Sequence, residues 1–182
     1  MVASVPIPVY PRLHLFGGSL RGPVSGGILW LEGGYFDSRQ DRNGIDPFMP
    51  NSSFSALIGF ERQIATNLTV NGQWQVGYLN HYDTFKGEQQ TAGALFIRDE
   101  TRHLLTSRIT KLLHQELVTL STFIFYSPTD EDLYLRLSTE YKYSDEVILA
   151  FGGNLFAGKH EATDFGQLQK NDNLYLKVTY GF

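Results

Sequence analysis

The sequence predicts an all-β fold: an antiparallel up-and-down meander of about nine strands that forms a transmembrane β-barrel or part of one. Three observations carry this prediction. Apolar residues recur at every second position in segments of about ten residues, as in strands with one apolar and one polar face. The connections between these segments alternate between short and long. Aromatic residues gather near both ends of the apolar face.

The first four strands differ in how cleanly apolar and polar residues alternate. The segment 11–20 is strand-like by composition, with weak alternation. The segments 27–37 and 53–64 alternate with a few interruptions, and 68–78 alternates throughout. A clean period of two is the pattern of a strand with unlike faces, so these four segments predict the first half of the meander.

Five further strands follow. The segments 117–126, 133–143 and 174–182 alternate well, whereas 101–112 and 146–157 are strand-like mainly by composition. A helical spacing of apolar residues competes only in 101–112, where the flanking strands and two threonines favour a strand. An antiparallel meander with short turns at one rim and long loops at the other is typical of outer-membrane barrels. The short connections are 21–26, 65–67, 114–116 and 144–145, the medium one is 127–132, and the long ones are 38–52, 80–100 and 158–171.

Aromatic residues form two belts when the strands are phased so that the apolar face is continuous. Belts of this kind are expected where a wall meets the two headgroup regions of a bilayer, because aromatic rings with polar edges favour that level. The alternative is that Tyr and Phe are simply good strand formers. The belt at the long-loop end contains Tyr35, Tyr78 and Tyr126, and the belt at the short-turn end contains Phe60, Tyr141, Tyr143, Tyr180 and Phe182.

The polar face of the strands is the candidate functional surface, because it would line the lumen of a membrane barrel. Its basic members favour anionic or hydroxyl-rich solutes. A lumen plugged by mutually paired charges is the alternative to an open path. The predicted pore-lining residues are Glu32, Glu61, Asn71, Gln73, Gln75, Arg108, Arg136, Glu140, Lys142 and Lys177.

Composition excludes several other classes of function. There are no cysteines, so a disulfide framework, a thiol nucleophile and a cysteine metal site are excluded. The net charge of −4 argues against a general nucleic-acid binder. No apolar run approaches the ~20 residues of a membrane helix. Membrane strands are not excluded by this, because they alternate apolar and polar residues and contain no long apolar run.

Enzyme, metal and cofactor chemistry are not expected. The five histidines are scattered without a catalytic or zinc-binding spacing. His103 and Ser107 share a face, but four residues of strand place them ~13 Å apart, too far for a hydrolytic pair. The loop segment Asp41–Asp46 resembles part of a calcium loop, yet it lacks the full spacing and the final glutamate, and it is also ordinary turn chemistry.

The last nine residues, Leu174–Phe182, carry a more specific signal. They form an alternating strand that ends in Phe182, with Tyr180 two positions earlier. This strand resembles the C-terminal signal of bacterial outer-membrane β-barrels, which the barrel-assembly machinery reads. The stretch 101–182 looks like the C-terminal part of large porin-like proteins. The resemblance implies a bacterial outer-membrane location, contact with lipid, passive passage of small solutes, and no cofactor.

Residues 1–182 are therefore interpreted as one β-barrel domain or the C-terminal portion of a larger barrel, with 1–10 as an extended lead-in. An odd strand count would place the two ends of the wall on opposite sides of the membrane, whereas bacterial barrels have even counts. The residues before Arg12 also lack the pattern of an export signal. We therefore expect upstream strands of the same protein, or other copies, to complete the wall. Two alternatives remain: a soluble lipocalin-like barrel that binds an apolar ligand inside, and a non-conducting outer-membrane barrel with a structural or adhesion role.

Overall fold

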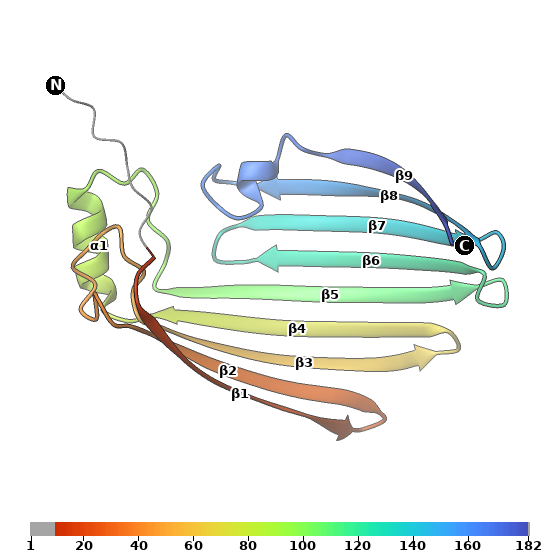
Figure 1. Ribbon diagram of the computed structural model, residues 1–182, viewed down its shortest axis with the longest axis horizontal. Coiled ribbons are helices and arrows are strands. Elements are labelled where there is room, and N and C mark those ends of the chain that lie inside the picture. The colour runs from red at the N-terminus through yellow and green to blue at the C-terminus, as the bar shows by residue number, and fades with distance from the viewer. Residues whose placement is uncertain (1–9, 182) are drawn as a thin grey trace.

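The computed structural model describes residues 10–181 and contains one antiparallel sheet of nine strands, arranged in chain order (Figure 1). Each strand pairs with its neighbours in sequence, so the predicted up-and-down meander is confirmed. The strands are β1 (Leu13–Val24), β2 (Gly27–Ser38), β3 (Ser53–Ala65), β4 (Leu68–Leu79), β5 (Thr101–Leu113), β6 (Val118–Ser127), β7 (Asp132–Lys142), β8 (Val147–Gly158) and β9 (Asn173–Tyr180).

Three of the short connections, at 25–26, 66–67 and 114–117, contain residues in the left-handed region. Ser25 and Gly26 have φ values of 49° and 74°, and Asn67 has a φ of 57°. Successive positive φ values suit two-residue hairpins, because their twist matches that of the flanking strands. The prediction of a turn over 21–26 was therefore too long: β1 pairs with β2 as far as Val24.

The long connection 80–100 differs from the sequence-based expectation of an irregular loop. It contains the helix α1 (Tyr82–Thr91), with Asp83 in its first turn and only Phe85 buried. The helix presents a single large apolar anchor, so a search for apolar periodicity gives little signal there. The connection after β8 contains a single 3-10 turn, η1 (Gly166–Leu168). No helix between residues 10 and 181 is long and apolar enough to cross a membrane.

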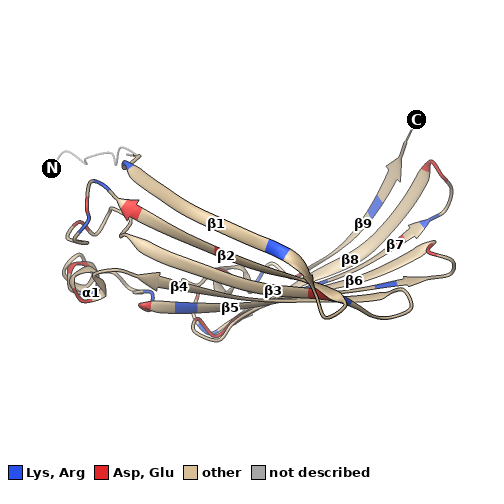
Figure 2. Ribbon diagram, turned by 90° about the horizontal axis from the view of Figure 1, so that it is seen from below, with Lys and Arg blue, Asp and Glu red and all other residues tan. Residues whose placement is uncertain are grey.

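The sheet is open. The two edge strands, β1 and β9, pair with β2 and β8 respectively and not with each other. A closed barrel is therefore not observed for the described part of the chain, and the finer prediction, that the meander forms a transmembrane barrel or part of one, is not confirmed. Figure 2 shows that the sheet is strongly twisted and curved, and that charged residues occupy little of the strand length.

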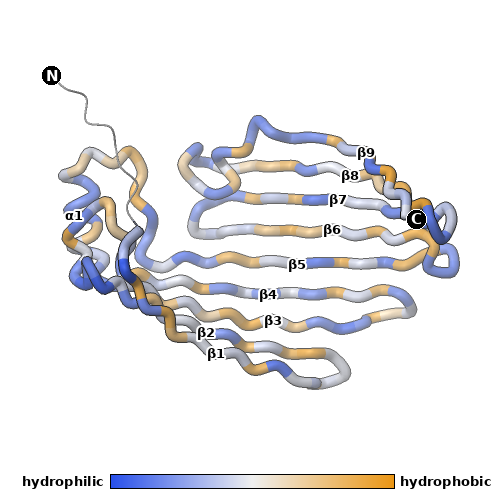
Figure 3. Tube along the Cα trace, in the orientation of Figure 1, coloured by the Kyte–Doolittle hydropathy of each residue, from blue (hydrophilic) through white to orange (hydrophobic). Residues whose placement is uncertain are grey.

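The pairing register collects the apolar residues of all nine strands on one face. Phe16, Tyr35, Phe54 and Tyr78 are successive partners across β1–β4, for example. Leu137 pairs with Gly153, which pairs with Leu174, at the other side of the sheet. Paired residues share a face, so the period-two patterns of the separate strands combine into one continuous apolar surface. Figure 3 shows the resulting alternation of hydropathy along the strands.

This apolar face is the convex one. Most of its large side chains are exposed, including those of Leu20, Ile58, Trp74 and Phe151. The opposite face is less exposed, and it carries the depression described below. Within the described chain only Leu79, Phe85 and Ala150 are buried hydrophobic residues. The sheet therefore has no packed second layer, and its apolar side chains point outward.

Candidate functional site

The concave polar face is the candidate functional surface, and the register places all ten predicted pore-lining residues on it. Several of them belong to one row that crosses the sheet at right angles to the strands. The members of this polar row are successive partners on β3–β9: Glu61, Asn71, Arg108, Phe123, Arg136, Asn154 and Asn173. Glu140, in β7, and Lys177, in β9, lie two rows further toward the short-turn end, where both pair with Ala150.

Neighbours in the polar row contact one another without closing the face. Asn71 Nδ2 donates to Glu61 Oε2 over 3.5 Å, and Asn154 Nδ2 donates to Asn173 Oδ1 over 2.8 Å. The guanidinium of Arg108 lies 4.8 Å from the ring centroid of Phe123, a cation–π geometry. The guanidinium of Arg136 lies 5.9 Å from the ring centroid of Tyr175, so an aromatic ring accompanies each of the two guanidinium groups.

The charges of this face are not neutralised by one another. Among residues 10–181, no ion pair joins any two of Glu61, Arg108, Arg136, Glu140 and Lys177. The ion pairs of the described chain lie at the long-loop end, as in Arg102 with Asp164. Charges that stay available to a passing solute are those that set the selectivity of a pore.

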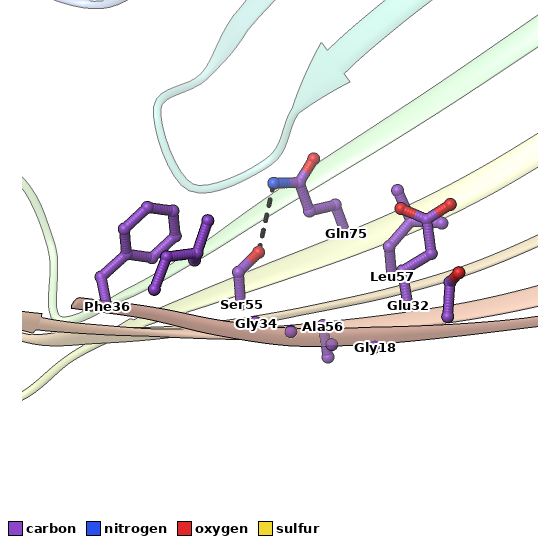
Figure 4. Close-up of a pocket in the computed structure, with 12 residues that line it drawn as sticks. Gly18, Glu32, Gly34, Phe36, Ser55, Ala56, Leu57 and Gln75 are labelled. Carbon is purple, nitrogen blue, oxygen red and sulfur yellow. Dashed lines mark hydrogen bonds between the residues drawn. The ribbon is translucent and has the colours of Figure 1, made fainter.

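The β1–β4 part of the concave face is a shallow depression of about 630 Å³. Figure 4 shows Glu32, Phe36, Ser55 and Gln75 rising from the same side of the sheet. Gln75 Nε2 donates to Ser55 Oγ over 3.4 Å, and small residues such as Gly34 form the floor. Leu15, Phe36 and Leu57 also line it, so this half of the face offers a mixed polar and apolar lining with room above it.

The β6–β8 part of the concave face is filled by aromatic rings, which sequence reasoning missed. Phe125, Tyr134 and Phe156 are partners in register, with ring centroids 5.5 Å and 4.7 Å apart. Phe165, from the loop after β8, lies against the first two rings. In the sequence, the only sign of this cluster is an aromatic residue at a polar-face position in each of three adjacent strands. That these residues lie side by side follows only from the pairing register.

The long-loop aromatic belt lies at its predicted level on the convex face. Tyr35 OH accepts a hydrogen bond from Asn80, Tyr78 OH donates to Glu100 over 2.9 Å, and Tyr126 is exposed near the end of β6. The hydroxyls of Tyr35 and Tyr78 thus contact the polar rim while their rings stay on the apolar face. The row that contains Tyr35 and Tyr78 adds Phe16 and Phe54 to this belt.

Three of the five residues predicted for the short-turn belt lie near that end of the strands. Tyr141 pairs with the first residue of β6, Tyr180 pairs with the first residue of β8, and Tyr143 lies just beyond β7. Phe60, however, pairs with Gly72 and lies nearer to the middle of β3, so its placement in this belt was wrong. The alternating pattern did not show that β3 continues for five residues beyond Phe60, pairing with β4 as far as Ala65. Phe182 lies outside the described residues.

The residues weighed for catalysis and metal binding are occupied by structural contacts. His103 Nδ1 accepts from Trp74 Nε1 over 3.2 Å, and Ser107 Oγ donates to the Asn71 carbonyl. Asp41 accepts from the backbone N–H groups of Ile45 and Asp46, as in turn chemistry. No group of metal-ligating side chains is found in the part of the chain that the structure describes.

No protein-family model, no curated protein and no solved structure matches this chain. The arrangement of its own residues is therefore what bears on its function.

Proposed function

We propose that this chain forms a wall, or part of the wall, of a passive channel in the outer membrane of a bacterium, and that small polar or anionic solutes pass along its polar concave face. No catalytic step and no cofactor is involved. The protein contributes a lipid-facing surface, a hydrated lining and charged groups that favour some solutes over others.

One observation carries the proposal: the continuous apolar face is the exposed, convex one. In β9, Leu174 and Leu176 are 76% and 75% exposed. Soluble monomers rarely expose contiguous apolar patches of more than a few hundred Å², whereas this face extends over nine strands. In a membrane, lipid chains would cover these apolar side chains and keep them from water. Strands of 8–13 residues also suit the ~9–11 residues that a tilted membrane strand requires.

The soluble alternative places the apolar face differently. A lipocalin-like barrel that binds an apolar ligand needs its apolar side chains on the concave face, and here that face carries Glu61, Arg108 and Arg136. The curvature of the sheet therefore favours the membrane proposal.

The polar row supports a conducting role and a preference for anions. Arg108 and Arg136 lie two strands apart, which corresponds to ~10 Å across the sheet. Arg108 lies over the ring of Phe123, and Arg136 lies over the ring of Tyr175 and donates to its hydroxyl. No described acidic side chain forms an ion pair with either, so both positive charges remain available to an anion. A plugged lumen would instead show these charges paired with one another.

The two open edges of the sheet require partners in lipid. Each backbone group left unpaired in the hydrocarbon region costs several kcal/mol, so β1 and β9 are expected to pair with further strands there. We propose that these come from upstream strands of the same protein or from other copies. Tyr180, in β9, would serve with Phe182 as the signal for the barrel-assembly machinery.

The decisive experiment is reconstitution of the full-length protein in planar bilayers, with conductance and reversal potential measured under a salt gradient. Conductance with an anion preference is expected. Replacing Arg108 and Arg136 together by glutamine should lower that preference, whereas the matched change Arg62→Gln, on the convex face, should leave it unchanged. A folded, membrane-inserted protein without conductance would reject the channel and favour the structural or adhesion role.

A further inference from the structure

The β6–β8 part of the polar face carries a cluster of stacked aromatic rings, Phe125, Tyr134 and Phe156. The adjoining positions on the same face are mainly polar or charged, and one further ring, that of Phe123, stacks on Phe125. The polar and charged neighbours are Thr106, Ser127, Asp132 and Arg136. A hydrated lining gives no reason for three stacked rings. A specific contact with another part of the chain does.

That contact is the loop after β8. The ring of Phe165 lies 5.9 Å from the centroid of Phe125 and 5.6 Å from that of Tyr134. Aromatic pairs at this separation are favourable beyond the area they bury. Phe165 is therefore an anchor that holds its loop down on the concave face.

Polar contacts fix the same loop at the anchor and at the residue before it. The Phe165 N–H donates to Asp132 Oδ2 over 2.9 Å, and Asp132 is only 1% exposed. Arg102 Nη2 lies 2.6 Å from Asp164 Oδ2, and the same guanidinium binds Asp130. Because Arg102 and Asp132 belong to the polar face of β5 and β7, these contacts draw the loop over that face.

The base of the loop is tied to the preceding hairpin. Lys159 Nζ donates to Glu131 Oε1 over 2.8 Å, and this hydrogen bond lowers the pKa of the Glu131 carboxyl. Gly158 lies so close to Gly166 that any side chain at Gly158 would meet the Gly166 backbone. The loop is thus in contact with the sheet from its first residue to its one-turn helix.

The loop 38–52 shows that docking of this kind is not general. It contacts the rim, through Asn51 to the Asn80 carbonyl and through Gln89 to the Pro47 carbonyl. Its own phenylalanine, Phe48, is 89% exposed. A phenylalanine in a long loop is therefore not docked by default. Phe165 is docked because Phe125 and Tyr134 lie beneath it.

The position of the docked loop matters for passage. Phe125 lies two residues inside the end of β6, ~7 Å below the rim. The next row toward the short-turn end contains Phe123 and Arg136. A solute that enters from the long-loop end along β6–β8 must pass the loop before it reaches the guanidinium of Arg136.

We propose that residues 159–172 form a fixed constriction of the channel, held on the polar face by Phe165, and that this constriction restricts access to Arg136 to small solutes. The role in passage rests on the proposed channel function. The docking itself can be tested whether or not the protein conducts.

The first test measures docking by limited trypsin digestion of the folded full-length protein. Lys159 and Lys170 are cleavage sites within the loop, and Arg39 and Arg42, in the loop 38–52, serve as internal references. Phe165→Ala should raise cleavage within the loop about tenfold, since removing an aromatic anchor changes a local opening equilibrium by about that factor. Asp164→Asn, at an exposed side chain, should raise it less, and the control Phe48→Ala should leave it unchanged.

The second test measures the constriction in planar bilayers. Phe165→Ala should raise single-channel conductance and admit neutral polymers of larger radius, whereas Phe48→Ala should behave as the unmodified protein does. Conducting channels whose conductance and size limit are the same with and without Phe165 would overturn the constriction. Unchanged trypsin cleavage in both Phe165→Ala and Asp164→Asn would overturn the docking. Absence of conductance in the unmodified protein would reject the channel while the digestion result still decides the docking.

Discussion

Replacing Leu137 by arginine separates a lipid-facing wall from a water-exposed one. Leu137 is the sixth of the eleven residues of β7 and is 46% exposed on the convex face. Its partners in register are Thr122 and Gly153, so no large side chain lies directly opposite it on either neighbouring strand. The substitution therefore tests the medium around the side chain rather than the packing beneath it.

The two media predict different free energies. An arginine on the lipid face of a membrane barrel destabilises it by ~2–4 kcal/mol at the bilayer midplane and by ~0–1 kcal/mol near the interfaces. An exposed surface substitution in a soluble protein usually changes stability by less than ~0.5 kcal/mol. We expect a loss of ~2–4 kcal/mol for Leu137→Arg, and a smaller loss for Tyr141→Arg at the short-turn rim of the same strand.

The matched control is Ser138→Arg, one residue along β7 but on the polar face. Its charge faces a hydrated surface, so we expect a change within ~0.5 kcal/mol. Denaturant unfolding in phospholipid vesicles, followed by the fluorescence of the two tryptophans, gives the three free energies. Equal losses for Leu137→Arg and Ser138→Arg would refute the assignment of the convex face to lipid.

Three further outcomes follow from the structure. Exchange of both Arg108 and Arg136 for glutamate should convert an anion preference into a cation preference, measured as a change in sign of the reversal potential. Asn67→Val should destabilise the fold by ~1–2 kcal/mol, because Asn67 has a φ of 57°, whereas Asn67→Gly should be tolerated; denaturant unfolding compares them. Gly152→Val should displace the ring of Tyr175, which occupies the space of the missing side chain, and should lower stability by ~1–3 kcal/mol, measured in the same way. An equally stable Gly152→Val protein would show that the ring has another position available.

The helix in the connection 80–100 could not be predicted from the sequence pattern. Its sequence is polar, and it buries only Phe85, so no apolar stripe marks it. The anchor Phe165 is similar: a single phenylalanine in a polar loop carries no periodic signal. Both are positioned by contacts with distant segments, in one case through the Gln89 bond to Pro47 and in the other through Asp132. Contacts of that kind have no local pattern in the chain.

The sequence by itself determined the strands and which residues share a face, because the side-chain period of a strand is two and depends on no partner. It therefore predicted the separation of Glu61, Arg108 and Arg136 from the apolar residues, which the register confirms. Only the tertiary structure decided that the apolar face is convex and that the loop after β8 folds over the polar one. Periodicity distinguishes two faces but not inside from outside, since curvature arises from the twist and pairing of all nine strands together.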